Sequence, residues 1–341
     1  MNRLVVLLPL FLGSITFADQ WEKPLERIAF GSCYRENRSA DIWNAVEGSK
    51  PDLFVFLGDN IYGDTEEMEV MWSKYEKLRS VPAYQELKSS CPILATWDDH
   101  DYGKNDAGEE YPMKAESQKL LLKAFDVPEE RRPWRGEGVY DAYRFGPEGK
   151  VVQVILLDTR YFRSPLVKQE TVLHPRLGPY GETLDPEATI LGEAQWAWFR
   201  EQVKEPADLR IVASSIQVLA RDHHWERWQN IPAERELFFA TLKEGLSIPT
   251  VLLSGDRHSS EIMEMPLSDA LHPGYPLYEV TASGLNQGGG GSRDEPNRYR
   301  IGPRFMKSNF GVLEIDWSGD APKVSMQIRD IEGETVLQLD R

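Results

Sequence analysis

Short runs of apolar residues recur along the chain, and most of them end abruptly in polar residues. The runs cover residues 27–30, 53–57, 92–96, 151–157, 210–219 and 250–253. A continuous apolar run of this length is typical of a β-strand buried on both faces, as in a sheet covered by helices. The pattern therefore predicts strands that lie between layers of helices.

Segments with apolar residues at helical spacing lie between these runs. We expect helices at residues 41–47, 66–78, 113–125, 193–203 and 234–242. After residue 276, four apolar segments follow without helices between them, at residues 277–285, 310–318, 324–330 and 335–340. The sequence thus predicts an α/β first part and a more antiparallel last part, packed as one domain, with residues 284–300 as a flexible glycine-rich loop.

The first residues have the pattern of an export signal. Residues 1–3 form a short basic segment, and residues 4–17 are almost entirely apolar. Ala18 follows as the small residue that a signal peptidase requires. We expect cleavage of residues 1–18, a single mature domain of residues 19–341, and a secreted or periplasmic location. The alternative is an uncleaved anchor, although the run is short for a membrane span.

Composition narrows the class of function. The 341 residues are 41% hydrophobic and 28% charged, with a formal net charge of −16, which is the balance of an ordinary folded protein. A protein that binds nucleic acid through its phosphates needs a basic surface, so we expect no nucleic-acid binding. The acidity is compatible with cation binding and equally with solubility.

The stretch LATWDDHDYGKND, residues 94–106, concentrates carboxylates and an imidazole at the end of an apolar run. Crowded carboxylates in a partly desolvated place destabilise the fold unless a cation lies among them. If the segment is extended, Asp99 and Asp101 point one way and Asp98 and His100 the other. The stretch therefore indicates either a metal site or a strongly solvated loop.

Two further stretches place similar groups after other predicted strands. GDNIYGD, residues 58–64, offers Asp59 as a bridging carboxylate and Tyr62 as a phenolate suited to ferric iron. SGDRH, residues 254–258, offers Asp256 and His258, which share one face of an extended segment. Taken alone, residues 58–64 are as typical of a solvated turn as of a metal site. Taken alone, residues 254–258 are more typical of a buried Asp–His pair. Because ligands bind beyond the carboxyl ends of strands in α/β sheets, together they favour one convergent site.

In this order the motifs resemble those of the calcineurin-like metallophosphoesterases, whose pattern runs D-x-H, G-D, G-N-H and G-H-x-H. Here Gly31-Ser32-Cys33 replaces the first motif, Asp98-Asp99-His100 replaces G-N-H, and Asp256 replaces the first His of the last. With Leu157-Asp158-Thr159-Arg160, these variations are similar to the alkaline phosphatase D family over residues 27–260. The resemblance implies an α/β fold, a sandwich of two mixed β-sheets flanked by helices.

The resemblance also implies a site for ferric iron and calcium, with other divalent cations possible. The positions that match the iron ligands are Cys33, Asp59, Tyr62 and His258, and the positions that match the calcium ligands are Asp59, Asp99 and Asp256. Thiolate, phenolate and imidazole suit iron, and oxygen donors suit calcium.

Phosphate contacts follow from the same resemblance. His100 stands where the superfamily places the histidine that contacts the phosphoryl oxygen or protonates the leaving group. Further candidate contacts are Arg160, Lys104, Asn105, His223 and His224. Arg160 is equally well explained as a structural ion-pair partner.

The two cysteines do not fit a disulfide, although export favours one. Cys91 begins the run at residues 92–96, whereas Cys33 follows the run at residues 27–30. In parallel neighbours these ends are about 15 Å or more apart at ~3.3 Å per residue, and a disulfide needs Cα atoms within about 7 Å.

We therefore expect an exported, monomeric, metal-dependent phosphatase or phosphodiesterase that acts on a small phosphate ester or a phospholipid head group. Two alternatives stay open. One is a phospholipase-like phosphodiesterase, with the aromatic run at residues 221–230 as a pocket wall. The other is an exported calcium-binding protein without turnover.

Overall fold

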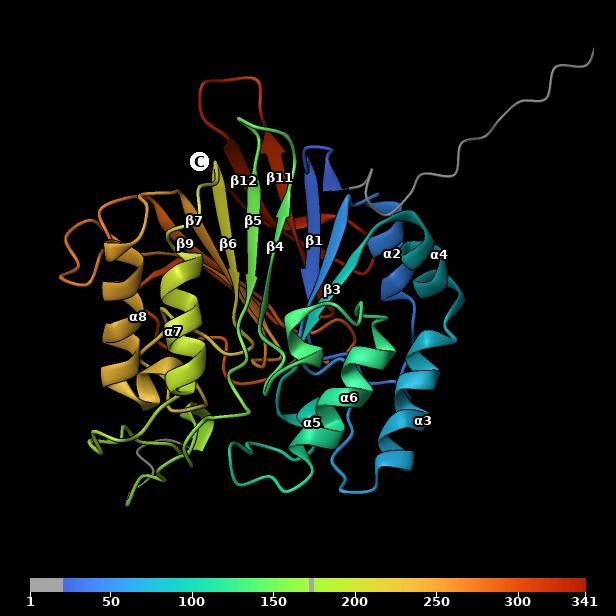
Figure 1. The fold of residues 1–341 in the computed structure, drawn as a ribbon, viewed down its shortest axis with the longest axis vertical. Helices are drawn as coiled ribbons and strands as arrows, with labels where there is room; N and C mark the ends of the chain where they lie inside the picture. Colours follow the sequence, from blue (N-terminus) through green and yellow to red (C-terminus); the bar gives the residue numbers. More distant parts are fainter. Residues whose placement is uncertain (1–20, 172–174) are drawn as a thin grey trace, which may run out of the picture.

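Two mixed β-sheets packed face to face form the centre of the protein, and helices cover both outer faces (Figure 1). The computed structural model describes residues 21–171 and 175–341. The predicted signal peptide, residues 1–18, lies outside the described residues. The predicted class, a helix-flanked sandwich of two mixed sheets, is confirmed.

The first sheet has the strand order β13-β12-β11-β1-β2-β3. Strands β1 to β3 are parallel and carry the first three apolar runs, whereas the last three strands are antiparallel, as the helix-free end of the sequence predicts. The bounds are β1 Arg27–Gly31, β2 Leu53–Leu57, β3 Ile93–Thr96, β11 Asn309–Asp316, β12 Lys323–Asp330 and β13 Thr335–Asp340.

The second sheet has the strand order β10-β8-β9-β7-β6-β5-β4, and β5, β6, β7 and β9 are parallel at its centre. The bounds are β4 Asp141–Phe145, β5 Val152–Leu156, β6 Leu209–Ala213, β7 Thr250–Ser254, β8 Ser260–Glu264, β9 Leu277–Ala282 and β10 Arg300–Phe305. A bridge between Ser32 and Ser283 joins the chain just after β1 to the chain just after β9, so the two sheets meet at their carboxyl ends.

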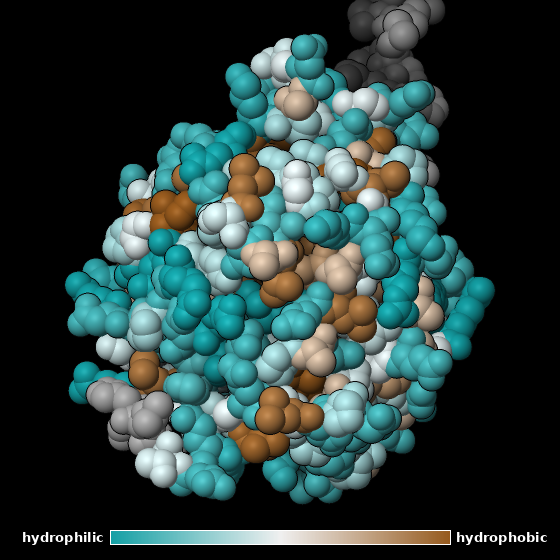
Figure 2. All heavy atoms as spheres, turned by 90° about the vertical axis from the view of Figure 1, so that its left-hand side faces the viewer, coloured by the Kyte–Doolittle hydropathy of each residue, from teal (hydrophilic) through white to brown (hydrophobic). Residues whose placement is uncertain are grey.

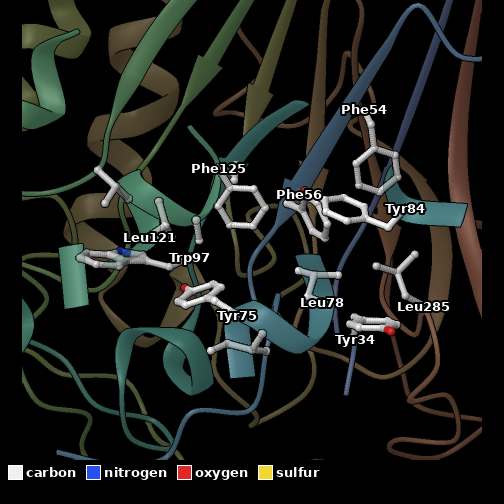
Figure 3. Close-up of a cluster of buried hydrophobic side chains, with 14 of the residues drawn as sticks. Tyr34, Phe54, Phe56, Tyr75, Leu78, Tyr84, Trp97, Leu121, Phe125 and Leu285 are labelled. Atoms are coloured by element: carbon white, nitrogen blue, oxygen red, sulfur yellow. The ribbon is translucent and has the colours of Figure 1, made fainter. Parts of the chain in front are cut away.

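The helices are α2 Ile42–Gly48, α3 Met68–Arg79, α4 Pro82–Ser90, α5 Asp99–Tyr102, α6 Lys114–Ala124, α7 Gly192–Gln202 and α8 Pro232–Glu244. Helices α2, α3, α4 and α6 pack on the first sheet, and α7 and α8 on the second. In Figure 3, Phe54 and Phe56 of β2 face Tyr84 of α4 and Leu78 of α3 across this interface. Truncating a buried aromatic ring here to Ala should cost about 3–5 kcal/mol.

The predicted strand at residues 210–219 ends early, at Ala213. Its last residues stay apolar because they pack beneath α7 and α8, but the backbone N–H groups of Val218 and Leu219 donate to the carboxylate of Glu279 instead of a neighbouring strand. Five helices and strands that the sequence pattern did not predict are α4, α5, β4, β8 and β10. Of these, β4 and β10 are sheet edges, where the alternation is weak and proline is tolerated.

Hydrophilic residues cover most of the face shown in Figure 2, and hydrophobic residues appear between them in small groups. Among the described helices, none has both the length and the apolar composition needed to cross a membrane.

Candidate metal centre

The candidate site lies where the carboxyl ends of strands from both sheets meet. Cys33 follows β1, Asp59 follows β2, Asp98 and Asp99 follow β3, and Asp256 follows β7. Gly58 allows the close approach of β2 and β3, because a Cβ atom there would lie 2.4 Å from Cβ of Asp98. The arrangement of the strands thus brings residues that are far apart in the sequence into one cluster.

The backbone at four of these positions lies in the left-handed region that residues other than glycine avoid. The φ angles are 60° at Cys33, 51° at Asp59, 65° at Asp256 and 51° at His258. Each such conformation costs on the order of 1–3 kcal/mol and persists only where surrounding contacts hold it. This concentration of strain at neighbouring polar residues is typical of a functional site.

A first group of ligand atoms combines sulfur, nitrogen and oxygen. The atoms offered by Cys33, Asp59 and His258 all lie within 4.8 Å of one another. Sγ of Cys33 is 3.3 Å from Oδ2 of Asp59, and the hydroxyl of Tyr62 is 2.9 Å from Nε2 of His258 and 3.5 Å from Oδ2 of Asp59. Such a mixed donor set fits a transition-metal ion.

A second group offers only carboxylate oxygens, from Asp59, Asp98, Asp99 and Asp256, again within 4.8 Å of one another. Oδ2 of Asp98 is buried without a hydrogen-bond donor, and Asp256 accepts no hydrogen bond from the described residues. Unpaired buried carboxylates are costly, and a hard cation such as calcium satisfies them. Asp59 belongs to both groups, so one carboxylate is shared between them.

The electrostatics of the cluster also fit bound cations. Burial and neighbouring acidic groups raise the pKa of Asp59 and of Asp256 well above the usual range. Burial raises the pKa of Asp98 to about 7, although Arg160 acts in the opposite direction, and it raises the pKa of the Cys33 thiol to about 12. These groups hold their protons more tightly than free side chains do, and a bound cation would displace the protons.

His100 lies at the open side of the cluster and is oriented by Asp64. Its Nδ1 is 2.7 Å from Oδ1 of Asp64, and its ring centroid is 4.1 Å from that of Tyr62. Burial lowers the pKa of His100, but the carboxylates of Asp99, Asp59 and Asp64 outweigh it and raise the pKa to about 10. Nε2 makes no hydrogen bond with the described residues, so this nitrogen is available to a ligand.

Residues 98–101 are not extended, because the segment turns into α5. Asp101 faces away from the ligand cluster, and its Oδ1 accepts the backbone N–H groups of Asp98 at 2.8 Å and of Asp59 at 3.0 Å. The expected sharing of one side by Asp99 and Asp101 therefore does not occur. Asp101 instead fixes the turn that carries Asp59.

The extended geometry predicted for residues 254–258 is also wrong, although both polar side chains reach the cluster. The backbone N–H of Arg257 donates to the carbonyl of Gly255 at 2.8 Å, which closes a tight turn. As a result, Asp256 joins the all-oxygen group and His258 joins the group that contains Cys33.

Arg160 is an ion-pair partner, the structural alternative that the sequence left open. Its side chain is 0% exposed, its Nε donates to Oδ1 of Asp98 at 2.8 Å, and its Nη2 lies 2.6 Å from Oε2 of Glu226. The prediction that Arg160 contacts the phosphate group is therefore not supported, because a buried guanidinium held by two carboxylates has no open path to a substrate. Arg160 instead holds Asp98 at the all-oxygen group.

Of the other predicted phosphate contacts, only Asn105 lines the pocket at the cluster. Lys104 is exposed and is not among the lining residues. His223 is buried with Nε2 2.9 Å from Oε1 of Gln217, and Nδ1 of His224 lies 3.1 Å from the carbonyl oxygen of Tyr180. Both histidines thus bond within the fold and lie outside the pocket lining.

The pocket has a volume of about 170 Å³ and is lined by Asp99, His100, Asn105, Asp106, Trp225, Glu226, Asp256, Arg257, His258, Gly290 and Gly291. A larger hollow of about 580 Å³ lies along β11 and β12, but none of the candidate metal groups of the described residues lies there. The pocket at the cluster is therefore the one that combines space with metal-ligating chemistry.

Glu226 and Arg257 were not singled out as site residues from the sequence. Asp99, Asp106 and Glu226 form a further group with ligand atoms within 4.8 Å of one another, and Arg257 forms part of the pocket wall. Glu226 lies in the run that was predicted only as an aromatic wall. A single carboxylate in an aromatic run has no local signal of its own, and only the fold brings it to the site.

The chain is similar to known phosphatases. A family model described as PhoD-like phosphatase matches residues 28–316. Alkaline phosphatase D of Bacillus subtilis (strain 168) is 24% identical over 275 residues, which are 70% of this chain. The chain spans about half the length of that relative, since the match covers 46% of it.

Two solved structures share the fold. The structure of PhoD has a TM-score of 0.67 at 17% identity and covers 93% of this chain and 72% of its own. A dimetal phosphatase from Danio rerio has a TM-score of 0.51 at 14% identity and covers 93% of this chain and 99% of its own. Because the family model spans most of the chain and the fold agrees, the chain belongs to the PhoD-like phosphatase family.

Proposed function

We propose that this protein hydrolyses phosphoric esters at a site that holds two or more cations. The observation that carries the proposal is the position of Asp59, which belongs both to the group with Cys33 and His258 and to the all-carboxylate group. Iron would be held by Cys33, Asp59, Tyr62 and His258. Calcium would be held by Asp59, Asp98, Asp99 and Asp256.

When bound, the cations supply a hydroxide nucleophile from water near neutral pH and neutralise charge on the phosphoryl group. His100 lies in the pocket with Nδ1 held by Asp64, and its free Nε2 donates a proton to the leaving oxygen. Arg160 keeps Asp98 in place from the buried side. Asn105 offers a further polar contact at the pocket wall. No covalent enzyme intermediate is required.

We further propose export to the periplasm or the exterior, one phosphoesterase domain over residues 19–341, and a monomer. The pattern of residues 1–18 supports export. The substrate class is a phosphate ester, either a small molecule or a phospholipid head group. A calcium-binding protein without turnover is disfavoured, because Cys33, Tyr62 and His258 converge although calcium prefers other ligands.

The test is turnover of p-nitrophenyl phosphate and of bis(p-nitrophenyl) phosphate by the purified protein. We expect activity that is lost after dialysis against a chelator and that returns when iron and calcium are restored. Activity that survives complete removal of metal would exclude the proposed mechanism. Absence of turnover from protein loaded with both cations would favour the calcium-binding alternative.

A further inference from the structure

One wall of the pocket carries a basic residue, Arg257, beside the acidic ligand cluster. Arg257 lies between Asp256 and His258 in the sequence, but its side chain contacts different partners from theirs. Nη2 of Arg257 donates to both carboxylate oxygens of Glu295 at 2.9 Å, and the guanidinium carbon is 5.6 Å from the centroid of the Trp225 ring. The guanidinium is thus held at the pocket wall by one carboxylate and one aromatic ring.

The remaining donors of this guanidinium have no partner among the residues that the structure describes. Arg257 is 5% exposed and lines the pocket. Its Nε is buried without a hydrogen bond, and its Nη1 donates none to the described residues. A buried guanidinium with unpaired donors carries a desolvation cost that an anionic ligand would offset.

Two further guanidiniums, those of Arg304 and Arg227, lie near Arg257. Glu295 is shared with Arg304, whose Nη2 lies 3.2 Å from Oε1, so two guanidiniums compete for one carboxylate. Arg227 is 1% exposed and forms no ion pair among the described residues. Burial, followed by Arg257, Arg227 and Arg304, lowers the pKa of the neighbouring His223, so this histidine adds no charge. The wall therefore favours an anion in front of it.

The glycine-rich segment that the sequence singled out forms this wall. A Cβ atom at Gly290 would lie 2.6 Å from Cβ of His258 and 2.7 Å from the carbonyl oxygen of Arg257, so only glycine permits this approach. Glu295, from the same segment, is 1% exposed. Residues 284–299 form a loop, as predicted, and within it Gly290 packs against His258 while Glu295 accepts hydrogen bonds from Arg257.

We propose that Arg257 is a substrate-binding residue that donates hydrogen bonds to an anionic oxygen of the reacting phosphate group, and that Glu295 positions it. The inference rests on the proposed function, because that function makes the pocket a phosphate-ester site. Asp99, Asp256 and His258 line the same pocket as Arg257, so a phosphate group there would meet both the bound cations and the guanidinium.

The test compares binding of inorganic phosphate by metal-loaded wild-type protein, Arg257→Gln and Arg257→Lys, using titration calorimetry, together with KM and kcat for p-nitrophenyl phosphate. We expect Arg257→Gln to weaken phosphate binding and to raise KM by about tenfold to hundredfold, the weight of a hydrogen bond to a charged group. Arg257→Lys should recover part of the loss, because it keeps the charge without the planar fork.

Metal content and melting temperature are measured for each variant, and Arg298→Gln is the matched control. Arg298 is 57% exposed and pairs with Asp222 outside the pocket lining, so its loss should leave phosphate binding unchanged. If Arg257→Gln does not fold, Arg257→Lys replaces it: a severalfold loss of phosphate affinity in this variant would support the role of Arg257 in phosphate binding, and an unchanged affinity would refute it. Unchanged phosphate affinity in the folded variant with full metal content would overturn the inference.

Phosphate binding is measured without turnover, so the inference is decided separately from the proposed function. An inactive wild-type protein that binds phosphate through Arg257 would refute the hydrolase and keep the binding role. An active wild-type protein whose phosphate affinity does not change in Arg257→Gln would keep the hydrolase and refute the binding role of Arg257.

Discussion

Sγ of Cys33 lies 3.3 Å from Oδ2 of Asp59, although the residues follow different strands and are 26 positions apart. Both side chains are fully buried. Asp59 also offers a carboxylate oxygen within 4.8 Å of those of three further aspartates, Asp98, Asp99 and Asp256. One residue therefore links a sulfur-containing group to an all-oxygen group, and the geometry of the whole centre depends on it.

Replacing Asp59 by Asn should remove metal and activity together. The amide keeps the shape of the side chain but loses the charge that two cations would share. We expect metal content to fall by at least half and turnover to be lost, measured by elemental analysis and a phosphatase assay on the same sample. Asp320→Asn is the control, because Asp320 is exposed and remote from the centre. Full metal content in Asp59→Asn would contradict a bridging role.

Loss of His100 should affect turnover and spare the metal. His100→Ala should lower kcat by about 10²–10⁴, the usual contribution of a proton donor, while metal content stays near wild type. Asp64→Asn should give a smaller decrease, because the imidazole remains but loses the 2.7 Å contact that orients it. Normal kcat in His100→Ala would show that another group protonates the leaving oxygen.

The buried Arg160 should matter for stability. Arg160→Met leaves Asp98 and Glu226 without their shared cation, and breaking a buried pair from one side costs about 3–5 kcal/mol. Arg298→Met removes an exposed pair with Asp222 and should cost no more than about 1 kcal/mol. Chemical denaturation of the two variants measures the difference. Equal costs would mean that Arg160 is not held as the contacts indicate.

Metal-free protein should lose stability as the pH rises. Burial, the largest cause in each case, raises the pKa of Asp98 to about 7 and of Asp101 to about 8, above the values of an unfolded chain. The folded state thus binds more protons than the unfolded state between about pH 4 and these pKa values. The contribution of the two aspartates to the free energy of unfolding is therefore fully present below about pH 4, and it is lost as the pH rises through 7 and 8.

Thermal melting of chelator-treated protein at pH 5 and pH 9 tests this directly. We expect a lower melting temperature at pH 9, and a smaller difference after calcium is restored, because a cation replaces the protons. A metal-free protein that is more stable at pH 9 would contradict this reading of the cluster.

The strands and the positions of the site residues were largely predictable from the sequence. Buried parallel strands leave continuous apolar runs, and the polar residues that follow β2, β3 and β7 mark the edge where ligands gather. The local geometry was not predictable. Asp98 to Asp101 have no helical periodicity, and the turn into α5 depends on contacts with the backbone of Asp59, which lies on another strand.

Ion pairs between residues far apart in the sequence were not predictable either. Nothing near Arg160 indicates that Asp98, 62 residues away, receives its guanidinium. Likewise the pairing of Arg257 with Glu295 spans 38 residues and depends on the path of the glycine-rich segment. A sequence pattern shows which residues carry chemistry, whereas the fold decides which of them face the pocket and which hold the others in place.

The most direct measurement is elemental analysis of the purified protein beside its visible absorption spectrum. The proposed centre predicts iron near one per chain together with calcium, and a charge-transfer band that weakens in Tyr62→Phe or Cys33→Ser. Protein that binds neither iron nor calcium after loading with both, and that shows no such band, would contradict the proposed centre.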